Sequence, residues 1–224
     1  MAWIDVAGVS GAAVAGAALG PALHALARRL TGLRPRPAGP WLIWPCLLGA
    51  LCLGAPLAVR GVGPTAALQA VVLCGLAVGA LADAMAGIIP DAVNLALLAL
   101  GVLAAPLLPS ADWLTALIDG CVAAGLLAGL ALAFARLAHR PGLGWGDVKL
   151  LGALGACLGL ANALATLFLA AATALLWAGV VAAWRGWPSG RRLAFGPYLA
   201  LWGGVALLVD PHHRPWLNLL LGAA

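Results

Sequence analysis

The sequence predicts an all-α, multi-pass membrane protein, and three observations support this fold class. Of its 224 residues, 64% are hydrophobic and only 8% are charged. The mean hydropathy is +1.07, far above that of ordinary soluble domains. The chain also divides into several apolar runs, and a membrane-spanning helix needs about 20 mostly apolar residues. Because lipid offers backbone amides no hydrogen-bond partner, we expect each run to be helical.

The apolar runs and the polar residues between them predict spans at 6–27, 41–59, 65–86, 92–108, 113–137, 148–171, 172–184 and 195–210. The stretch 148–184 is too long for one span and barely long enough for two, so we expect seven or eight helices. Small residues at four-residue spacing would allow close helix contacts, as in the pairs Gly16 with Gly20, Gly125 with Gly129 and Gly155 with Gly159.

The basic residues predict the orientation of the chain in the membrane. If eight spans are counted, one side receives Arg28, Arg29, Arg34, Arg36, Arg136, Arg140, Lys149, Arg185, Arg191 and Arg192. Only Arg60 and Arg214 fall on the other side. Because basic loops stay in the cytoplasm, we expect the N-terminus outside. This clustering in short loops explains the net charge of +5 better than nucleic-acid binding does, so no nucleic acid is expected as a partner.

All seven acidic residues are aspartates, and most have a simple explanation. Asp5, Asp112 and Asp210 lie at span ends, where water or lipid headgroups solvate them. Asp119 lies inside the span 113–137, where an acidic side chain costs about 2.5–3.5 kcal/mol. We expect Asp119 to face the interior of the bundle, and both a packing role and a functional role stay open for it.

Asp83 and Asp147 are predicted to lie on the same membrane face. Asp83 ends the span 65–86 and Asp147 opens the span 148–171, with one outward and one returning span between them. Pro90 would interrupt a helix that continued from Asp83, so we expect Asp91 to cap the next helix. The sequence alone therefore favours the pair Asp83 and Asp147 without excluding Asp91.

Two aspartates that meet at a membrane interface suggest acid–base chemistry. Like charges close together cannot both ionise, so one carboxyl group keeps a proton and the other becomes a base. Such a pair can activate water against a peptide carbonyl. Gly144 and Gly146 would let a backbone come close, since they add no side-chain bulk. The alternative is structural, with Asp147 capping a helix and Lys149 extending to the interface.

Two motifs give the sequence a resemblance to a known family. Gly144-Trp145-Gly146-Asp147-Val148-Lys149 matches G-x-G-D-x-K, and Asp83 with Pro90-Asp91 matches D-x6-P-D. With these motifs the chain resembles the type IV prepilin peptidase family, the GxGD class of intramembrane aspartyl proteases. The stretch Phe195 to Gly204, "FGPYLALWGG", is similar to the start of the last helix in that family.

The resemblance implies a membrane endopeptidase that cleaves the N-terminal leader of type IV prepilins or prepilin-like proteins. Its partners would be the prepilin helix and the lipid bilayer, and the reaction would occur at the cytoplasmic face of the bacterial cytoplasmic membrane. It implies Asp83 and Asp147 as the catalytic pair. The remaining motif or substrate-binding positions would be Gly144, Gly146, Lys149, Pro90 and Asp91.

The chain also departs from the bifunctional members of that family. Those members carry a cytoplasmic insert after the first span, with two C-x-x-C pairs that bind zinc, and they N-methylate the product with S-adenosylmethionine. Here the corresponding loop, Thr31 to Pro40, contains no cysteine. We therefore expect no metal, no zinc and no S-adenosylmethionine. The predicted organisation is one membrane-embedded domain over 1–224, with a reduced N-terminal region at 1–60 and the catalytic core at 61–224.

Two other classes of function stay open. A small proton-coupled transporter would use Asp83, Asp119 and Asp147 as intramembrane ion ligands, but such carriers tend to show internal repeats, and none is visible. A non-catalytic component of a pilus or secretion assembly could keep the same fold and motifs.

Overall fold

A computed structural model describes residues 6–33, 43–60, 63–107, 112–139, 143–185 and 194–209. The helices are α1 Val6–Leu30, α2 Ile43–Arg60, α3 Pro64–Ala86, α4 Asp91–Ala104, α5 Trp113–Ala138, α6 Trp145–Leu158, α7 Leu160–Arg185 and α8 Gly196–Val209, with the 3-10 turn η2 Ala105–Leu107. No strand occurs among the described residues, so the all-α prediction is confirmed. Among them, four helices are long and apolar enough to cross a membrane, namely α1, α3, α5 and α7.

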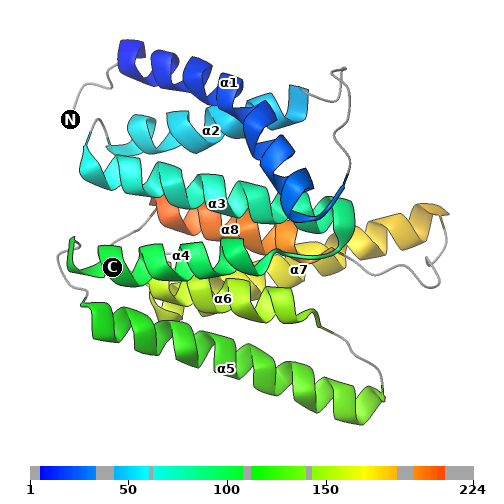
Figure 1. The fold of residues 1–224 in the computed structure, drawn as a ribbon. Coiled ribbons are helices and arrows are strands. Elements are labelled where there is room, and N and C mark those ends of the chain that lie inside the picture. Colours follow the sequence, from blue (N-terminus) through cyan, green and yellow to red (C-terminus); the bar gives the residue numbers. More distant parts are fainter. Residues whose placement is uncertain are drawn as a thin grey trace, which may run out of the picture.

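Consecutive helices run in alternating directions (Figure 1). One end of the bundle therefore gathers the last turns of α1, α3, α5 and α7 with the first turns of α2, α4, α6 and α8. We call it the motif end, because it carries Asp83 in the last turn of α3 and Asp147 in the first turn of α6. The sequence-based prediction that two spans between these aspartates return the chain to the same end agrees with this arrangement.

The predicted boundary between the sixth and seventh spans is wrong. The prediction divided 148–184 after residue 171, whereas the structure divides it at Gly159. Gly159 has φ 79° and ψ 158°, a conformation that ends α6 and that residues with a side chain rarely adopt. As a result α6 has only 14 residues, about 21 Å of helix, which is shorter than the bilayer core of about 30 Å.

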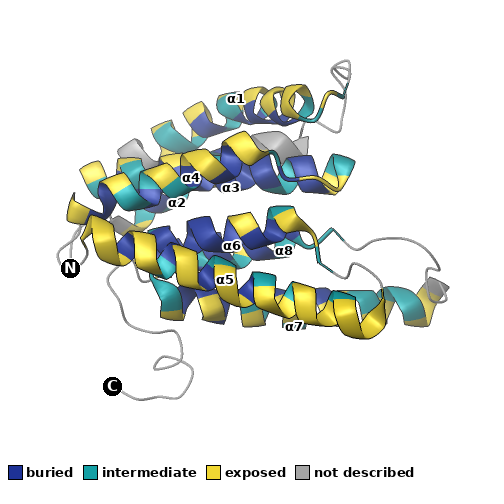
Figure 2. Cartoon of the chain, turned by 60° about the horizontal axis from the view of Figure 1, so that its bottom comes forward, coloured by how far each residue is buried: buried dark blue, intermediate teal, exposed yellow. Residues whose placement is uncertain are grey.

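The short helix α6 forms the centre of the protein. Leu150, Leu151 and Leu154 are almost wholly buried, and every residue of α6 from Leu150 to Ala156 lies inside. Figure 2 shows the contrast with α5 and α7, which carry many exposed residues on their outer faces. In a bilayer those outer apolar faces would contact lipid, because lipid solvates them as well as protein does. The fold thus holds α6, and with it Asp147, on the inside.

Small residues bring the central helices together. A Cβ added at Gly155 of α6 would lie 2.7 Å from the backbone oxygen of Asp119 on α5. One added at Gly101 of α4 would lie 2.8 Å from the backbone carbon of Ala156. The close contact expected of Gly155 is therefore confirmed, as is that of Gly16 and Gly20, which lie against Gly49 of α2. The same expectation is wrong for Gly125 and Gly129, since nothing lies within 4 Å of a Cβ added there.

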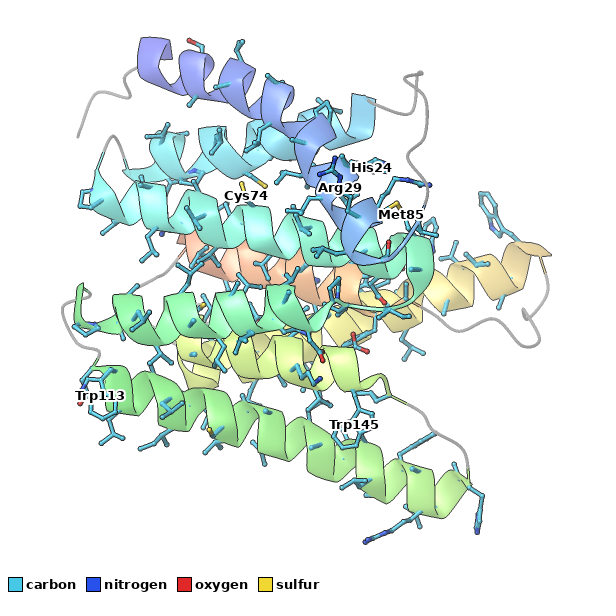
Figure 3. All side chains as sticks on the ribbon, in the orientation of Figure 1. His24, Arg29, Cys74, Met85, Trp113 and Trp145 are labelled. Atoms are coloured by element: carbon cyan, nitrogen blue, oxygen red, sulfur yellow. The ribbon has the colours of Figure 1, made fainter. Side chains whose placement is uncertain are left out.

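Two exposed tryptophans mark opposite ends of the bundle. Trp113 opens α5 and Trp145 opens α6, and Figure 3 shows them at the two ends. Tryptophan favours the membrane–water interface, where its apolar ring and its N–H group are both accommodated. The motif end therefore lies at one membrane interface, in agreement with the basic residues Arg28, Arg29 and Arg136 in the last turns of α1 and α5.

Candidate active site

Asp83 is buried in the last turn of α3, with 7% of its surface exposed. The helix ends three residues later, at Ala86, because Gly87 takes a left-handed conformation, φ 68°, and its N–H group donates to the Asp83 carbonyl at 2.7 Å. The side chain accepts a second backbone hydrogen bond from far along the sequence. The N–H group of Gly196, at the start of α8, donates to Asp83 Oδ2 at 2.8 Å.

Asp147 is buried in the first turn of α6, with 8% of its surface exposed. The alternative interpretation of Asp147 as the cap of this helix is wrong, since Gly144 occupies the cap position and Asp147 is the third residue of the helix. The absence of a side chain at Gly144 leaves room for the carboxyl group of Asp147. A Cβ at Gly144 would lie 3.1 Å from Asp147 Oδ2, so a side chain there would press on the carboxyl group.

The buried side chain of Ile89 packs between the segments that carry the two aspartates. It lies in the short link between α3 and α4, and it contacts both Gly146 and Gly196. A Cβ at Gly146 would lie 3.2 Å from Ile89 Cβ, and one at Gly196 would lie 3.0 Å from Ile89 Cδ1. Gly146 of the G-x-G-D motif thus lets α6 approach the link between α3 and α4. The helices that carry Asp83 and Asp147 therefore meet at Ile89, which also contacts Gly79 of α3.

Two polar contacts at this site were not predicted from the sequence. Buried Asn94 on α4 donates from Nδ2 to the carbonyl oxygen of Gly146 at 3.4 Å, which ties α4 to the G-x-G-D segment. The other is the hydrogen bond from Gly196 to Asp83. The sequence could have indicated the contact of Asn94, because a polar amide in an apolar helix needs a buried hydrogen-bond partner. For the backbone N–H group of Gly196, the sequence offered no indication of its partner beyond the Gly-Pro pair that opens α8.

Asp91 and Lys149 form an ion pair on the exposed surface near the motif end. Lys149 Nζ lies 2.7 Å from Asp91 Oδ1, and the two side chains are 49% and 75% exposed. The prediction that Asp91 caps α4 is wrong, because Pro90 occupies the cap position and Asp91 is the first helical residue. Lys149 therefore links α6 to α4. The exposed positions of both side chains leave them outside the buried aspartate pair.

We expect this exposed ion pair to contribute little to folding. Asp91→Asn should lower the free energy of unfolding by about 0.2–1 kcal/mol, since exposed pairs gain little in water. Thermal unfolding in detergent at low and high salt measures this, and salt should reduce the difference between variant and wild type. A large loss that salt does not change would contradict this view and would mean that the pair is part of the buried packing.

The remaining acidic residues divide as follows. Asp112 caps α5, where Oδ1 accepts a hydrogen bond from the Thr115 N–H group at 2.7 Å, so its exposed position at a span end is confirmed. Hydrogen bonds from the side chain and the backbone of Thr115 lower the pKa of the Asp112 carboxyl group. Asp119 is half-buried, and its backbone oxygen faces Gly155 of α6. Asp5 and Asp210 lie outside the described residues.

Within the described part of the chain, no group of three His, Cys, Asp or Glu side chains is arranged to hold a metal ion. The expectation that the protein uses neither zinc nor S-adenosylmethionine stays a prediction, as does the division into 1–60 and 61–224.

Fold and site together define a multi-pass, all-α membrane protein with two buried aspartates at one end of its bundle. Comparison with known proteins then gives the family. Residues 70–179 match the model of the type IV leader peptidase family. The "Prepilin leader peptidase/N-methyltransferase" proteins of Burkholderia pseudomallei strains 1026b and K96243 are each 43% identical over 164 residues. These two findings assign the chain to the type IV prepilin peptidase family.

The aligned region covers 71% of this chain and 51% of each relative. The chain thus spans about half the length of the curated relatives it matches. No solved structure gives a significant match. The family segment 70–179 includes Asp83 and Asp147 together with the motif residues Gly144, Gly146, Lys149, Pro90 and Asp91.

Proposed function

We propose that this protein is a membrane aspartyl endopeptidase that removes the N-terminal leader from type IV prepilins or prepilin-like proteins. One observation supports the proposal above all others. Asp83 and Asp147, which are 64 residues apart in the sequence, are both buried at the same end of the bundle, on helices that pack against the same side chain, Ile89. The family match and the name of the relatives agree with a leader peptidase.

The proposed reaction needs one ionised and one protonated carboxyl group. Two close carboxyl groups cannot both carry a charge at low cost, so the pair shares one proton. The carboxylate takes a proton from a water molecule while the water oxygen bonds to the peptide carbonyl carbon. The protonated partner gives its proton to the carbonyl oxygen. The tetrahedral intermediate then collapses and the C–N bond breaks. The carboxyl group that took the water proton gives it to the leaving nitrogen, and its partner recovers a proton from a hydroxyl group of the intermediate, which yields a carboxylic acid and a free amine and restores the shared proton.

The surroundings of the pair suit an extended substrate. Gly144 presents no side chain toward Asp147 Oδ2, so a substrate backbone has fewer obstacles near that carboxyl group, while Gly146 leaves room for Ile89. Ile89 and the neighbouring Val93 are apolar and buried, which would limit bulk water at the pair. Among the motif positions, Pro90 begins α4 and so fixes the link that carries Ile89. Lys149 and Asp91 are exposed enough to contact a polar leader.

The site would work at the cytoplasmic face of the bacterial cytoplasmic membrane. Arg28, Arg29, Arg136 and Lys149 all belong to helix turns at the motif end, and basic residues mark the cytoplasmic side. A substrate anchored by an apolar helix would therefore present the start of that helix next to Asp83 and Asp147. The partners of this reaction are the prepilin helix and the surrounding lipid. We include no cofactor and no methyl transfer in the proposal.

Co-expression with a candidate prepilin tests this function. A prepilin with a short basic leader and an apolar helix is produced with the wild-type protein, and leader loss is followed by gel shift and by N-terminal sequencing. We expect a shortened product whose new N-terminus lies where the apolar helix begins. A full panel of such prepilins that all stay intact beside a well-folded wild-type protein would instead favour a non-catalytic assembly component.

A further inference from the structure

The start of α8 contacts Asp83 directly. Gly196 is the first residue of this helix, and it is buried. Its N–H group is one of those at a helix start that have no partner within the helix. Here the partner is Asp83 Oδ2, at 2.8 Å. An anionic acceptor at this place also benefits from the partial positive charge of the helix start.

Only glycine fits at position 196. A Cβ there would lie 2.8 Å from Asp83 Oδ2, 3.0 Å from Asp83 Cβ and 3.0 Å from Ile89 Cδ1. The neighbour at 2.8 Å is the carboxyl oxygen that accepts the hydrogen bond, so a methyl group would displace the acceptor itself. The absence of a side chain thus allows the short contact between helix start and carboxyl group.

Two further contacts hold α8 in place. Gln69 Nε2 on α3 donates to the carbonyl oxygen of Leu207 near the end of α8 at 2.9 Å. Trp202 Nε1 in the middle of α8 donates to Thr173 Oγ1 on α7 at 3.1 Å. Because α8 is tied to both α3 and α7, its first N–H group stays at a fixed position relative to Asp83.

We infer that Gly196 is a positioning residue, whose N–H group fixes the carboxyl group of Asp83 through Oδ2 and so leaves Oδ1 to react. This inference rests on the proposed peptidase function. A carboxyl group held at one oxygen keeps its orientation toward Asp147, and a shift of about 1 Å in a catalytic group can cost 10²-fold in rate. Gly196 would therefore act on the chemical step and not on substrate binding.

Kinetics of two matched glycine variants on α8 test this role. Gly196→Ala should lower kcat for leader cleavage by about 10²-fold and change KM less than about twofold. The control is Gly204→Ala, about two turns further along α8, where the added Cβ meets only the terminal methyl carbon Leu73 Cδ2, at 3.0 Å. This contact lies far from Asp83 along α8 and does not involve α6, so kcat per folded molecule should stay unchanged. Equal loss of kcat in both variants, or a normal kcat in Gly196→Ala, would overturn the inference.

A second measurement does not depend on activity. Tm in detergent is compared for Gly196→Ala in the wild-type background and in an Asp83→Ala background, where the crowded carboxyl oxygen is gone. We expect Gly196→Ala to lower Tm by about 3 °C or more in the wild type and by clearly less beside Asp83→Ala. Equal losses in the two backgrounds would overturn the contact. A smaller loss of Tm in the Asp83→Ala background would uphold the contact. If the wild-type protein then cleaved no prepilin, the contact would stand but the proposed peptidase function, on which the positioning role depends, would not.

Discussion

Asp147→Asn is expected to lower the rate of leader cleavage by about 10³–10⁴-fold while the protein stays folded. Asparagine keeps the shape of the side chain but can neither take up nor release a proton, so the shared proton is lost. Asp83→Asn should have the same effect. Because the two residues act as one unit, the double variant should be little slower than either single variant. Initial cleavage rates of purified variants in detergent measure this.

Asp112→Asn is the matched control for these two substitutions. Asp112 lies at the opposite end of the bundle, where it caps α5, and asparagine caps helices as well as aspartate does. We expect its cleavage rate to equal that of the wild type. A rate near that of the wild type for Asp83→Asn or Asp147→Asn would rule out the two-aspartate mechanism. An equal loss in Asp112→Asn would show that the assay reports folding.

The second large effect concerns packing around α6. Gly155→Ala would put a methyl group 2.7 Å from the backbone oxygen of Asp119 and 2.9 Å from Ala123 Cβ. The backbone of α5 cannot give way as a flexible side chain can, so α5 and α6 must move apart. We expect the free energy of unfolding to fall by about 1–3 kcal/mol, the usual cost of overpacking. Thermal unfolding in detergent measures the loss.

Gly129→Ala on α5 is the control for this substitution. It introduces the same methyl group where nothing lies within 4 Å, so it should be neutral or stabilise the helix by up to about 1 kcal/mol. If both variants lost the same stability, the contact between α5 and α6 would not be the cause. Because α6 carries Asp147, Gly155→Ala should also reduce cleavage in detergent.

The fold was predictable because it depends on hydropathy averaged over whole helices. Five of the helices begin and end within three residues of the predicted spans, and α1 and α3 are examples. The boundary at Gly159 was not predictable in the same way. It depends on the backbone conformation of a single glycine, and the chain contains 30 glycines. Most of those that the structure describes simply continue a helix.

The site was predictable only in part. The two motifs and the count of intervening spans led to Asp83 and Asp147, since both quantities can be read along the chain. The supporting contacts could not be found in that way. The hydrogen bond from Gly196 to Asp83 joins residues 113 positions apart, and its donor is a backbone group that every residue but proline possesses. Similarly, the sequence predicts Lys149 as a motif residue, with extension to the interface as the alternative, but its partner Asp91 follows only from the packing of α4 against α6.

Cleavage by the purified protein in liposomes tests the aspartate pair most directly. A prepilin with a basic leader and an apolar helix is reconstituted with the wild-type protein, and the product mass is measured by mass spectrometry. We expect a single cut between leader and apolar helix, and no product with the double variant Asp83→Ala/Asp147→Ala. The same product from the double variant, or none from the wild-type protein, would contradict the assignment of Asp83 and Asp147 as the catalytic pair.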